Sequence, residues 1–164
     1  MENRTIETQV RQILASYGIE VCAFLGAEDL HVIQPHLMPE HVKSAAIWLI
    51  PYYTGAHPER NVSLYSVSKD YHLFSRALGN TLVSTLSERH PDEFFKSFCD
   101  SSPIDEVGAA ADAGLGVIGK NRLLIHPKYG SFVFIGSLLM SADVPRDPKK
   151  PRGHCLECGL CGKA

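Results

Sequence analysis

Ala45-Ala-Ile-Trp-Leu-Ile-Pro-Tyr-Tyr53 is a continuous apolar run that carries the single tryptophan of the chain, Trp48. The run has the length of one strand, and its residues do not alternate between apolar and polar. Strands of this kind are covered on both faces, as in layered α/β proteins. The run therefore predicts a sheet that is packed between other elements.

The segments on either side of this run supply the other elements. The pattern predicts helices over 5–17, 65–89 and 103–113, and strands over 19–25, 94–99, 122–126 and 131–140. The last two strands are joined by Pro127-Lys-Tyr-Gly130, which is typical of a hairpin. The predicted fold class is α/β, with a mixed sheet and flanking helices.

Composition limits the kind of protein this can be. The 164 residues suffice for one substantial core, and 45% hydrophobic with 21% charged residues is ordinary for a globular protein. The net charge is -2 and no basic stripe is present, so composition gives no electrostatic footprint for nucleic acid. No apolar run approaches about 18 residues and the N-terminus lacks the apolar stretch of a signal peptide. We expect a cytoplasmic protein without a membrane span.

Three of the five cysteines are grouped in Cys155-Leu-Glu-Cys158-Gly-Leu-Cys161. In a reducing compartment such grouping indicates a metal site and not disulfides. The spacing matches the bacterial ferredoxin run Cys-x2-Cys-x2-Cys-x3-Cys-Pro, whose thiolates hold a 4Fe-4S cluster. The sequence predicts Cys155, Cys158 and Cys161 as cluster ligands.

Two further expectations follow from the cysteine run. The fourth cysteine of the ferredoxin pattern would come directly after Ala164, so the ligand set is incomplete and this segment alone should hold little or no cluster. A zinc site that uses His154 is the alternative, although zinc motifs usually place a second ligand pair about 12 or more residues away. The isolated Cys22 and Cys99 are expected to be buried structural thiols.

Gly114-Leu-Gly-Val-Ile-Gly119 matches the dinucleotide fingerprint G-x-G-x-x-G. That fingerprint has to follow a strand and open a helix. Here a helix is predicted before it and a strand after it, so the match is misleading. Two interpretations stay open: a bare helix-to-strand turn, or a turn that brings backbone close to a flat ligand, with Lys120 and Asn121 beside it.

An ordered series of motifs resembles the epoxyqueuosine reductase family from about residue 65 onward. The series consists of Lys69-Asp-Tyr-His72, Asp100-Ser-Ser-Pro103, Ala113-Gly-Leu-Gly-Val-Ile-Gly-Lys-Asn121, Leu123-Leu-Ile, Tyr129-Gly-Ser-Phe-Val-Phe-Ile-Gly136 and the final cysteines. Val117 and Arg122 replace the tryptophan and threonine that are usual in the family. The resemblance is weak before residue 65.

The resemblance implies a fold similar to the cobalamin domain of reductive dehalogenases, which is nitroreductase-like. It implies a cobalamin-binding α/β domain over 1–143, followed over 144–164 by a linker and a truncated ferredoxin module. The implied activity is the reduction of epoxyqueuosine to queuosine in tRNA, an oxidoreductase step of queuosine biosynthesis. A ferredoxin or flavodoxin would be the electron donor, tRNA would be bound by the full-length protein, and this segment alone would be inactive.

The resemblance also assigns roles to residues. Asp100 takes the place of the family's proton donor, and the expected cobalamin face is made by Tyr71, His72, Gly114, Gly116, Gly119, Lys120 and Asn121. From local sequence, the alternative for Asp100 is a cap on the helix that begins near Pro103.

Two other functions stay open at this point. One is a ferredoxin-like electron-transfer module with no chemistry of its own. The other is a flavin-dependent oxidoreductase, for which Arg76 and Lys120 are the candidate phosphate ligands.

Overall fold

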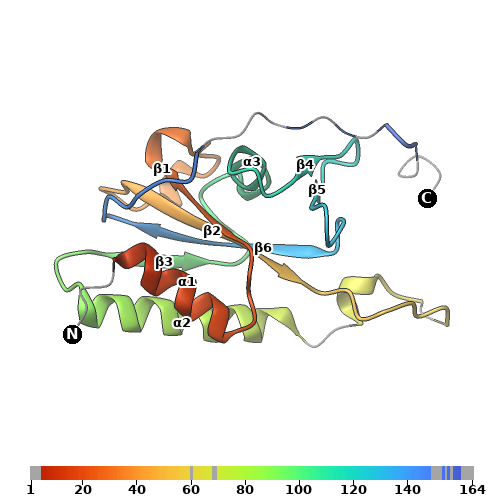
Figure 1. Ribbon diagram of the computed structural model, residues 1–164, viewed down its shortest axis with the longest axis horizontal. Coiled ribbons are helices and arrows are strands. Elements are labelled where there is room, and N and C mark those ends of the chain that lie inside the picture. The colour runs from red at the N-terminus through yellow and green to blue at the C-terminus, as the bar shows by residue number, and fades with distance from the viewer. Residues whose placement is uncertain are drawn as a thin grey trace.

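The computed structural model describes residues 5–59, 61–67, 70–148, 153, 155 and 157–159. A four-stranded sheet in the order β1-β2-β6-β3 forms its centre, and β4 and β5 form a separate two-stranded ribbon (Figure 1). The strands are β1 (Cys22–Gly26), β2 (Ser44–Pro51), β3 (Phe95–Phe98), β4 (Val117–Ile118), β5 (Leu124–Ile125) and β6 (Val133–Met140). The helices are α1 (Ile6–Ser16), α2 (Tyr71–Arg89) and α3 (Glu106–Asp112), with short 3-10 turns at Ala27–Asp29, Pro35–Leu37 and Leu64–Ser66.

Strand β2 is buried on both faces, as its apolar run predicts. Residues 44–50 are all buried, and only Pro51 at the end of the strand is exposed. Trp48 faces the helices α1 and α2, whereas its neighbours Ile47 and Leu49 face α3. The sheet therefore separates two apolar cores, and the α/β fold class with flanking helices is confirmed.

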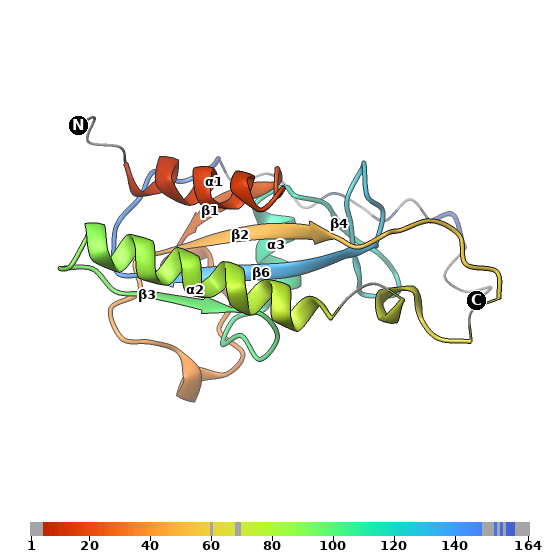
Figure 2. The same ribbon diagram turned by 90° about the horizontal axis from the view of Figure 1, so that it is seen from below.

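Helices α1 and α2 lie side by side on one face of the sheet (Figure 2). Helix α1 begins where the Thr5 hydroxyl accepts a hydrogen bond from the Thr8 amide, and it buries Val10 and Leu14. Helix α2 contributes the fully buried Leu78, Leu82 and Leu86 to the same core. None of the helices in the described residues is long and apolar enough to cross a membrane.

Helix α3 and the β4–β5 ribbon cover the opposite face (Figure 1). Helix α3 packs Ala109, Ala110 and Ala111 against the sheet, and these small side chains allow a close approach. Leu115 donates its amide to Ala110 and Gly114 donates to Ala111, with Gly114 at a φ of 75°. This left-handed glycine ends α3 and turns the chain into the ribbon.

Three details differ from the sequence expectations. The predicted hairpin between the strands at 122–126 and 131–140 is wrong. Strand β5 pairs with β4, and β6 pairs with β2 and β3. His126 and Gly130 form only an isolated bridge. The sequence predicts a mixed sheet with parallel and antiparallel strands. All described strand pairs of the main sheet are antiparallel. Helix α2 begins at Tyr71 and not at residue 65, because Asp70 caps it.

Candidate functional site

The Asp100 carboxylate is held by two aromatic side chains from the first turn of α2. Tyr71 Oη donates a hydrogen bond to Asp100 Oδ2 at 2.5 Å, and His72 Nε2 lies 3.1 Å from the same oxygen. The side chains of His72 and Asp100 are 53% and 55% exposed, so the group remains accessible from outside. The structure thus brings together three residues that the sequence predicts for the site, one catalytic and two cofactor-binding.

Asp70 completes this cluster from the other side of His72. Its Oδ1 accepts the His72 backbone amide at 3.0 Å as the helix cap and lies 2.8 Å from His72 Nδ1. These hydrogen bonds and the imidazole charge lower the pKa of Asp70. His72 is therefore oriented by carboxylates at both ring nitrogens, which fixes the imidazole beside Asp100.

Tyr71 is fixed by stacking as well as by its hydroxyl group. Its ring stacks on Phe134 at the start of β6, with centroids 3.9 Å apart and an interplanar angle of 12°. Burial, the hydrogen bond to Asp100 and the Asp100 charge raise the pKa of Tyr71. The phenol therefore keeps its proton near neutral pH and serves as a donor to the carboxylate.

Asp100 does not cap α3. That role belongs to Asp105, whose side chain accepts the Gly108 amide at 3.0 Å. Asp100 and Ser101 instead adopt left-handed backbone conformations, with φ values of 59° and 49°. Such conformations are costly for residues other than glycine and persist only where the surroundings impose them, often at functional sites. The alternative interpretation of Asp100 as a cap is therefore excluded.

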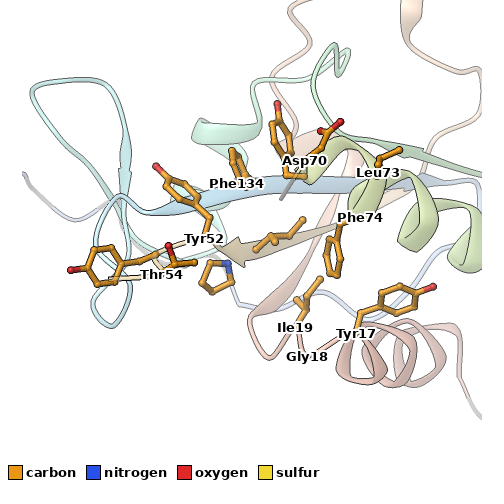
Figure 3. Close-up of a pocket in the computed structure, with 13 residues that line it drawn as sticks. Tyr17, Gly18, Ile19, Tyr52, Thr54, Asp70, Leu73, Phe74 and Phe134 are labelled. Atoms are coloured by element: carbon orange, nitrogen blue, oxygen red, sulfur yellow. The ribbon is translucent and has the colours of Figure 1, made fainter. Parts of the chain in front are cut away.

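An open, largely apolar cavity of about 530 Å³ lies next to this cluster (Figure 3). Asp70 and Tyr71 line it from α2, Tyr52 from the end of β2, and Phe134 from β6. The rings of Tyr52 and Phe134 lie 4.5 Å apart, so the wall near Tyr71 is a continuous set of aromatic rings. Cavities of this volume with apolar walls and a few polar groups are typical ligand sites.

The glycine turn lies on the other face of the sheet, with α3 and the ribbon. A helix precedes it and a strand follows it, as the sequence predicts. A Cβ atom on Gly116 would lie 2.6 Å from the Ile125 carbonyl oxygen, and one on Gly119 would lie 2.5 Å from Asn121 Oδ1. Gly116 is thus required by the backbone of the ribbon, whereas the atoms beside Gly119 belong to side chains. No hydrogen bond, ion pair or ring contact of the described residues joins the turn to Tyr71 or His72.

Lys120 and Asn121 also have local partners. Asn121 Oδ1 accepts the Leu123 amide at 3.3 Å, which shapes the turn between β4 and β5. Lys120 Nζ lies 3.5 Å from Glu157 Oε1, and the Lys120 backbone forms a hydrogen bond with Cys155. Lys120 therefore faces the cysteine segment.

The predicted cluster ligands are described in part. Hydrogen bonds from the backbones of Glu157 and Lys120 lower the pKa of Cys155, which favours the thiolate that binds metal. Cys158 is exposed, and Cys161 lies outside the described residues. Among the residues that are described, no group of three metal-binding side chains is assembled.

Cys22 and Cys99 were expected to be buried, but both are only half-buried. Burial raises the pKa of Cys22 to about 12 and also raises that of Cys99. Both thiols are therefore protonated near neutral pH, which agrees with a structural role.

Glu106 is a site residue that sequence reasoning missed. It is the first residue of α3, and its Oε1 accepts a hydrogen bond from Ser137 Oγ at 2.6 Å. Burial raises the pKa of Glu106 to about 7, and the negative charge of Asp100 contributes to this rise. In the sequence, an acidic residue in a first helical turn indicates only a favourable interaction with the helix dipole.

Curated proteins named epoxyqueuosine reductase are similar to this chain, whereas no family model matches it. The protein of Pseudomonas aeruginosa is 37% identical over 107 residues, which is 65% of this chain and 30% of that protein. The protein of Synechococcus sp. strain CC9605 is 33% identical over 130 residues, or 77% of this chain and 40% of that protein. The chain thus matches less than half the length of these relatives.

Solved structures agree with this similarity at the level of the fold. The epoxyqueuosine reductase of Streptococcus thermophilus superposes with a TM-score of 0.80 at 21% identity, over 98% of this chain and 52% of that one. An epoxyqueuosine reductase solved with an epoxyqueuosine-modified tRNA stem loop gives 0.77 at 20% identity, over 97% and 51%. A reductive dehalogenase described as B12-dependent gives 0.62 at 12% identity, over 98% and 23%.

The relatives and the folds lead to the same assignment. By the sequence of its matched region and by its fold, the chain belongs to the epoxyqueuosine reductase family.

Proposed function

We propose that this chain is the cofactor domain of a cytoplasmic, cobalamin- and iron–sulfur-dependent oxidoreductase that reduces epoxyqueuosine to queuosine in tRNA. The observation that carries the proposal is the Asp100 carboxylate, held by Tyr71 and His72 beside an aromatic cavity. The names of the curated relatives and the stem loop bound in one solved structure support the substrate. The proposal includes a cofactor domain over 1–143 and the start of a ferredoxin module over 144–164.

The cavity beside Asp100 fits a corrin ring in its chemistry. A corrin is broad and flat and needs a mostly apolar wall, which Tyr52, Tyr71 and Phe134 supply here. When bound, cobalamin would supply the reducing power that opens the carbon–oxygen bonds of the epoxide. Gly116 and Gly119 do not support a direct role at this ligand, since atoms of the ribbon itself occupy the space beside them.

The cysteine segment fits an iron–sulfur cluster in its donor chemistry. Thiolates are the ligands that such clusters take, and backbone hydrogen bonds to the Cys155 sulfur favour the thiolate. We infer that Cys155, Cys158 and Cys161 provide three of the ligands of this cluster. A ferredoxin or flavodoxin would deliver the electrons.

Asp100 serves as the proton donor in this proposal. Reduction of an epoxide to an alkene takes up two electrons and two protons and releases the oxygen as water. A proton has to reach that oxygen as its bond to carbon breaks, which is the task of a general acid. Tyr71 and His72 hold the carboxyl group in place, and the exposure of Asp100 gives a substrate access to it.

The experiment replaces Asp100 by asparagine in the full-length protein. The Asp100→Asn side chain keeps an oxygen for Tyr71 but has no acidic proton, so we expect cobalamin binding to be retained while reduction slows by roughly 10²- to 10⁴-fold. Cobalamin binding is followed by its absorption spectrum, and queuosine formation in a stem-loop RNA by mass spectrometry. Asp92→Asn, an exposed aspartate outside the site, is the matched control. Near-normal turnover by Asp100→Asn would exclude the acid role.

A further inference from the structure

The loop that carries Asp100 is held against the sheet by a network of buried polar groups. Ser102 is 5% exposed and Ser137 is fully buried, and their hydroxyl oxygens lie 3.4 Å apart. The Glu106 carboxylate accepts hydrogen bonds from both hydroxyl groups, with the Ser137 Oγ at 2.6 Å. Ser137 belongs to the central strand β6 and Ser102 follows Asp100 by two residues, so Glu106 ties the loop to the sheet.

The other side of the loop is held by hydrogen bonds to its main-chain carbonyl groups. The Pro103 carbonyl accepts the amides of Ile33 and Gln34 at 2.8 and 3.0 Å, and Gln34 Nε2 donates to the Ser102 carbonyl at 3.1 Å. The loop is thus anchored directly after the two left-handed residues Asp100 and Ser101. These anchors leave the Asp100 side chain free to face Tyr71 and His72.

The ionisable groups around Glu106 come from several elements. Asp100 and Cys99 face it from the segment after β3, Asp105 is its neighbour in the chain, and the hydroxyl groups of Ser102 and Ser137 donate hydrogen bonds to it. Asp100 in turn faces Tyr71 and His72 of α2. Glu106 therefore belongs to the same group of polar side chains as Asp100.

We propose that Glu106 is a positioning residue for Asp100, which holds the Asp100–Ser102 loop against the sheet through Ser102 and Ser137. The proposal rests on the proposed role of Asp100 as the acid. It assigns to Glu106 no contact with substrate or cofactor.

The test compares Glu106→Gln with Glu106→Ala in the full-length protein. Glutamine keeps an oxygen that accepts from Ser137 and Ser102 but carries no charge, whereas alanine removes both functions. We expect Glu106→Ala to reduce epoxyqueuosine more slowly by roughly 10- to 100-fold, because the loop that carries Asp100 loses its anchor. We expect Glu106→Gln to stay near the wild type. Hydrogen–deuterium exchange of residues 100–104 should be faster in the alanine variant and unchanged in the glutamine variant.

Glu93→Ala is the matched control. Glu93 also accepts a hydrogen bond from a serine, Ser141, and no interaction among the described residues joins either of them to Asp100. This variant should follow the wild type in turnover and in exchange at residues 100–104.

The outcomes separate this inference from the proposed function. If the wild type fails to reduce epoxyqueuosine, the proposed function is wrong, and the exchange measurements still decide whether Glu106 holds the loop. If the wild type is active and Glu106→Gln is as slow as Glu106→Ala, the hydrogen bonds that Glu106 accepts do not explain its effect and the positioning role is refuted. If exchange at 100–104 is unchanged in Glu106→Ala, the positioning role is refuted.

Discussion

The Asp100 cluster is a meeting of residues that lie far apart in the chain. The sequence contains one recognisable motif around Tyr71 and His72 and another around Asp100. It does not show that Tyr71 contacts Asp100, which lies 29 positions away. That contact depends on how α2 lies against the end of β3, which local patterns do not determine. Glu106 escaped detection for the same reason, because only the folded chain places Ser137 of β6 beside it.

Glu106 also gives a prediction for stability as a function of pH. Its pKa is raised from 4.5 to about 7 in the folded protein, so the folded state binds more protons than the unfolded state between these values. The stability associated with this group is fully present below pH 4.5 and is lost as the pH rises through 7. Glu106→Gln cannot ionise, so we expect its stability to rise relative to the wild type between pH 5 and pH 8.

Chemical denaturation at several pH values measures this difference. Glu93→Gln is the reference, since Glu93 also accepts a hydrogen bond from a serine, Ser141. A stability difference between Glu106→Gln and the wild type that stays constant from pH 5 to pH 8 would contradict the raised pKa of Glu106.

At the scale of elements, periodicity predicted which segments are helical or extended but not which strands pair. The apolar run of β2 and the helix before the glycine turn were identified correctly because burial on both faces and helical spacing leave local patterns. The short segment Leu124–Ile125 gives no such indication of its partner. It pairs with β4 because the turn at Asn121 returns the chain onto Val117–Ile118, while β6 continues to the main sheet.

The ribbon provides a prediction at this scale. Gly116→Ala places a Cβ atom 2.6 Å from the Ile125 carbonyl oxygen and 3.0 Å from its carbonyl carbon, so β4 and β5 have to move apart. We expect a loss of about 1–3 kcal/mol in the free energy of unfolding, measured with denaturant. Leu123→Ala, at an exposed position of the same turn, should change it by less than about 0.5 kcal/mol. An unchanged stability of Gly116→Ala would mean that the ribbon is not closely packed there.

This result also limits what Gly116 can reveal about the cofactor. A larger side chain at this position would disturb the ribbon whether or not a ligand lies nearby. Loss of cobalamin binding in such a variant would therefore not locate the corrin. Tyr52 and Phe134, in the wall of the cavity, are better positions for that purpose.

At the scale of the whole molecule, the sheet separates two cores that should respond independently to mutation. Leu82 lies in the core beneath α1 and α2, and Ile47 lies in the core beneath α3. We expect Leu82→Ala to cost about 2–5 kcal/mol and Ile47→Val about 0.5–1.5 kcal/mol. Their effects should add to within about 0.5 kcal/mol in the double variant, because the sheet lies between them.

Denaturant unfolding of the single and double variants provides the measurement. Leu78→Ala combined with Leu82→Ala gives the contrasting case, since these side chains are one turn apart on α2 and share a core. Strong coupling between Ile47 and Leu82 would show that the two cores do not behave separately.

The pairing of β2 with β6 has a consequence for how the protein is made. Strand β2 is complete at residue 51, but the strand that covers its second edge begins only at residue 133. During synthesis from the N-terminus, the apolar β2 and its hairpin partner β1 therefore emerge long before β6 can close the sheet. Sheets dominated by such distant strand pairings fold slowly, and until they are complete they expose unpaired strand edges that promote aggregation. The nascent chain should accordingly depend on chaperones until residue 140 has left the ribosome.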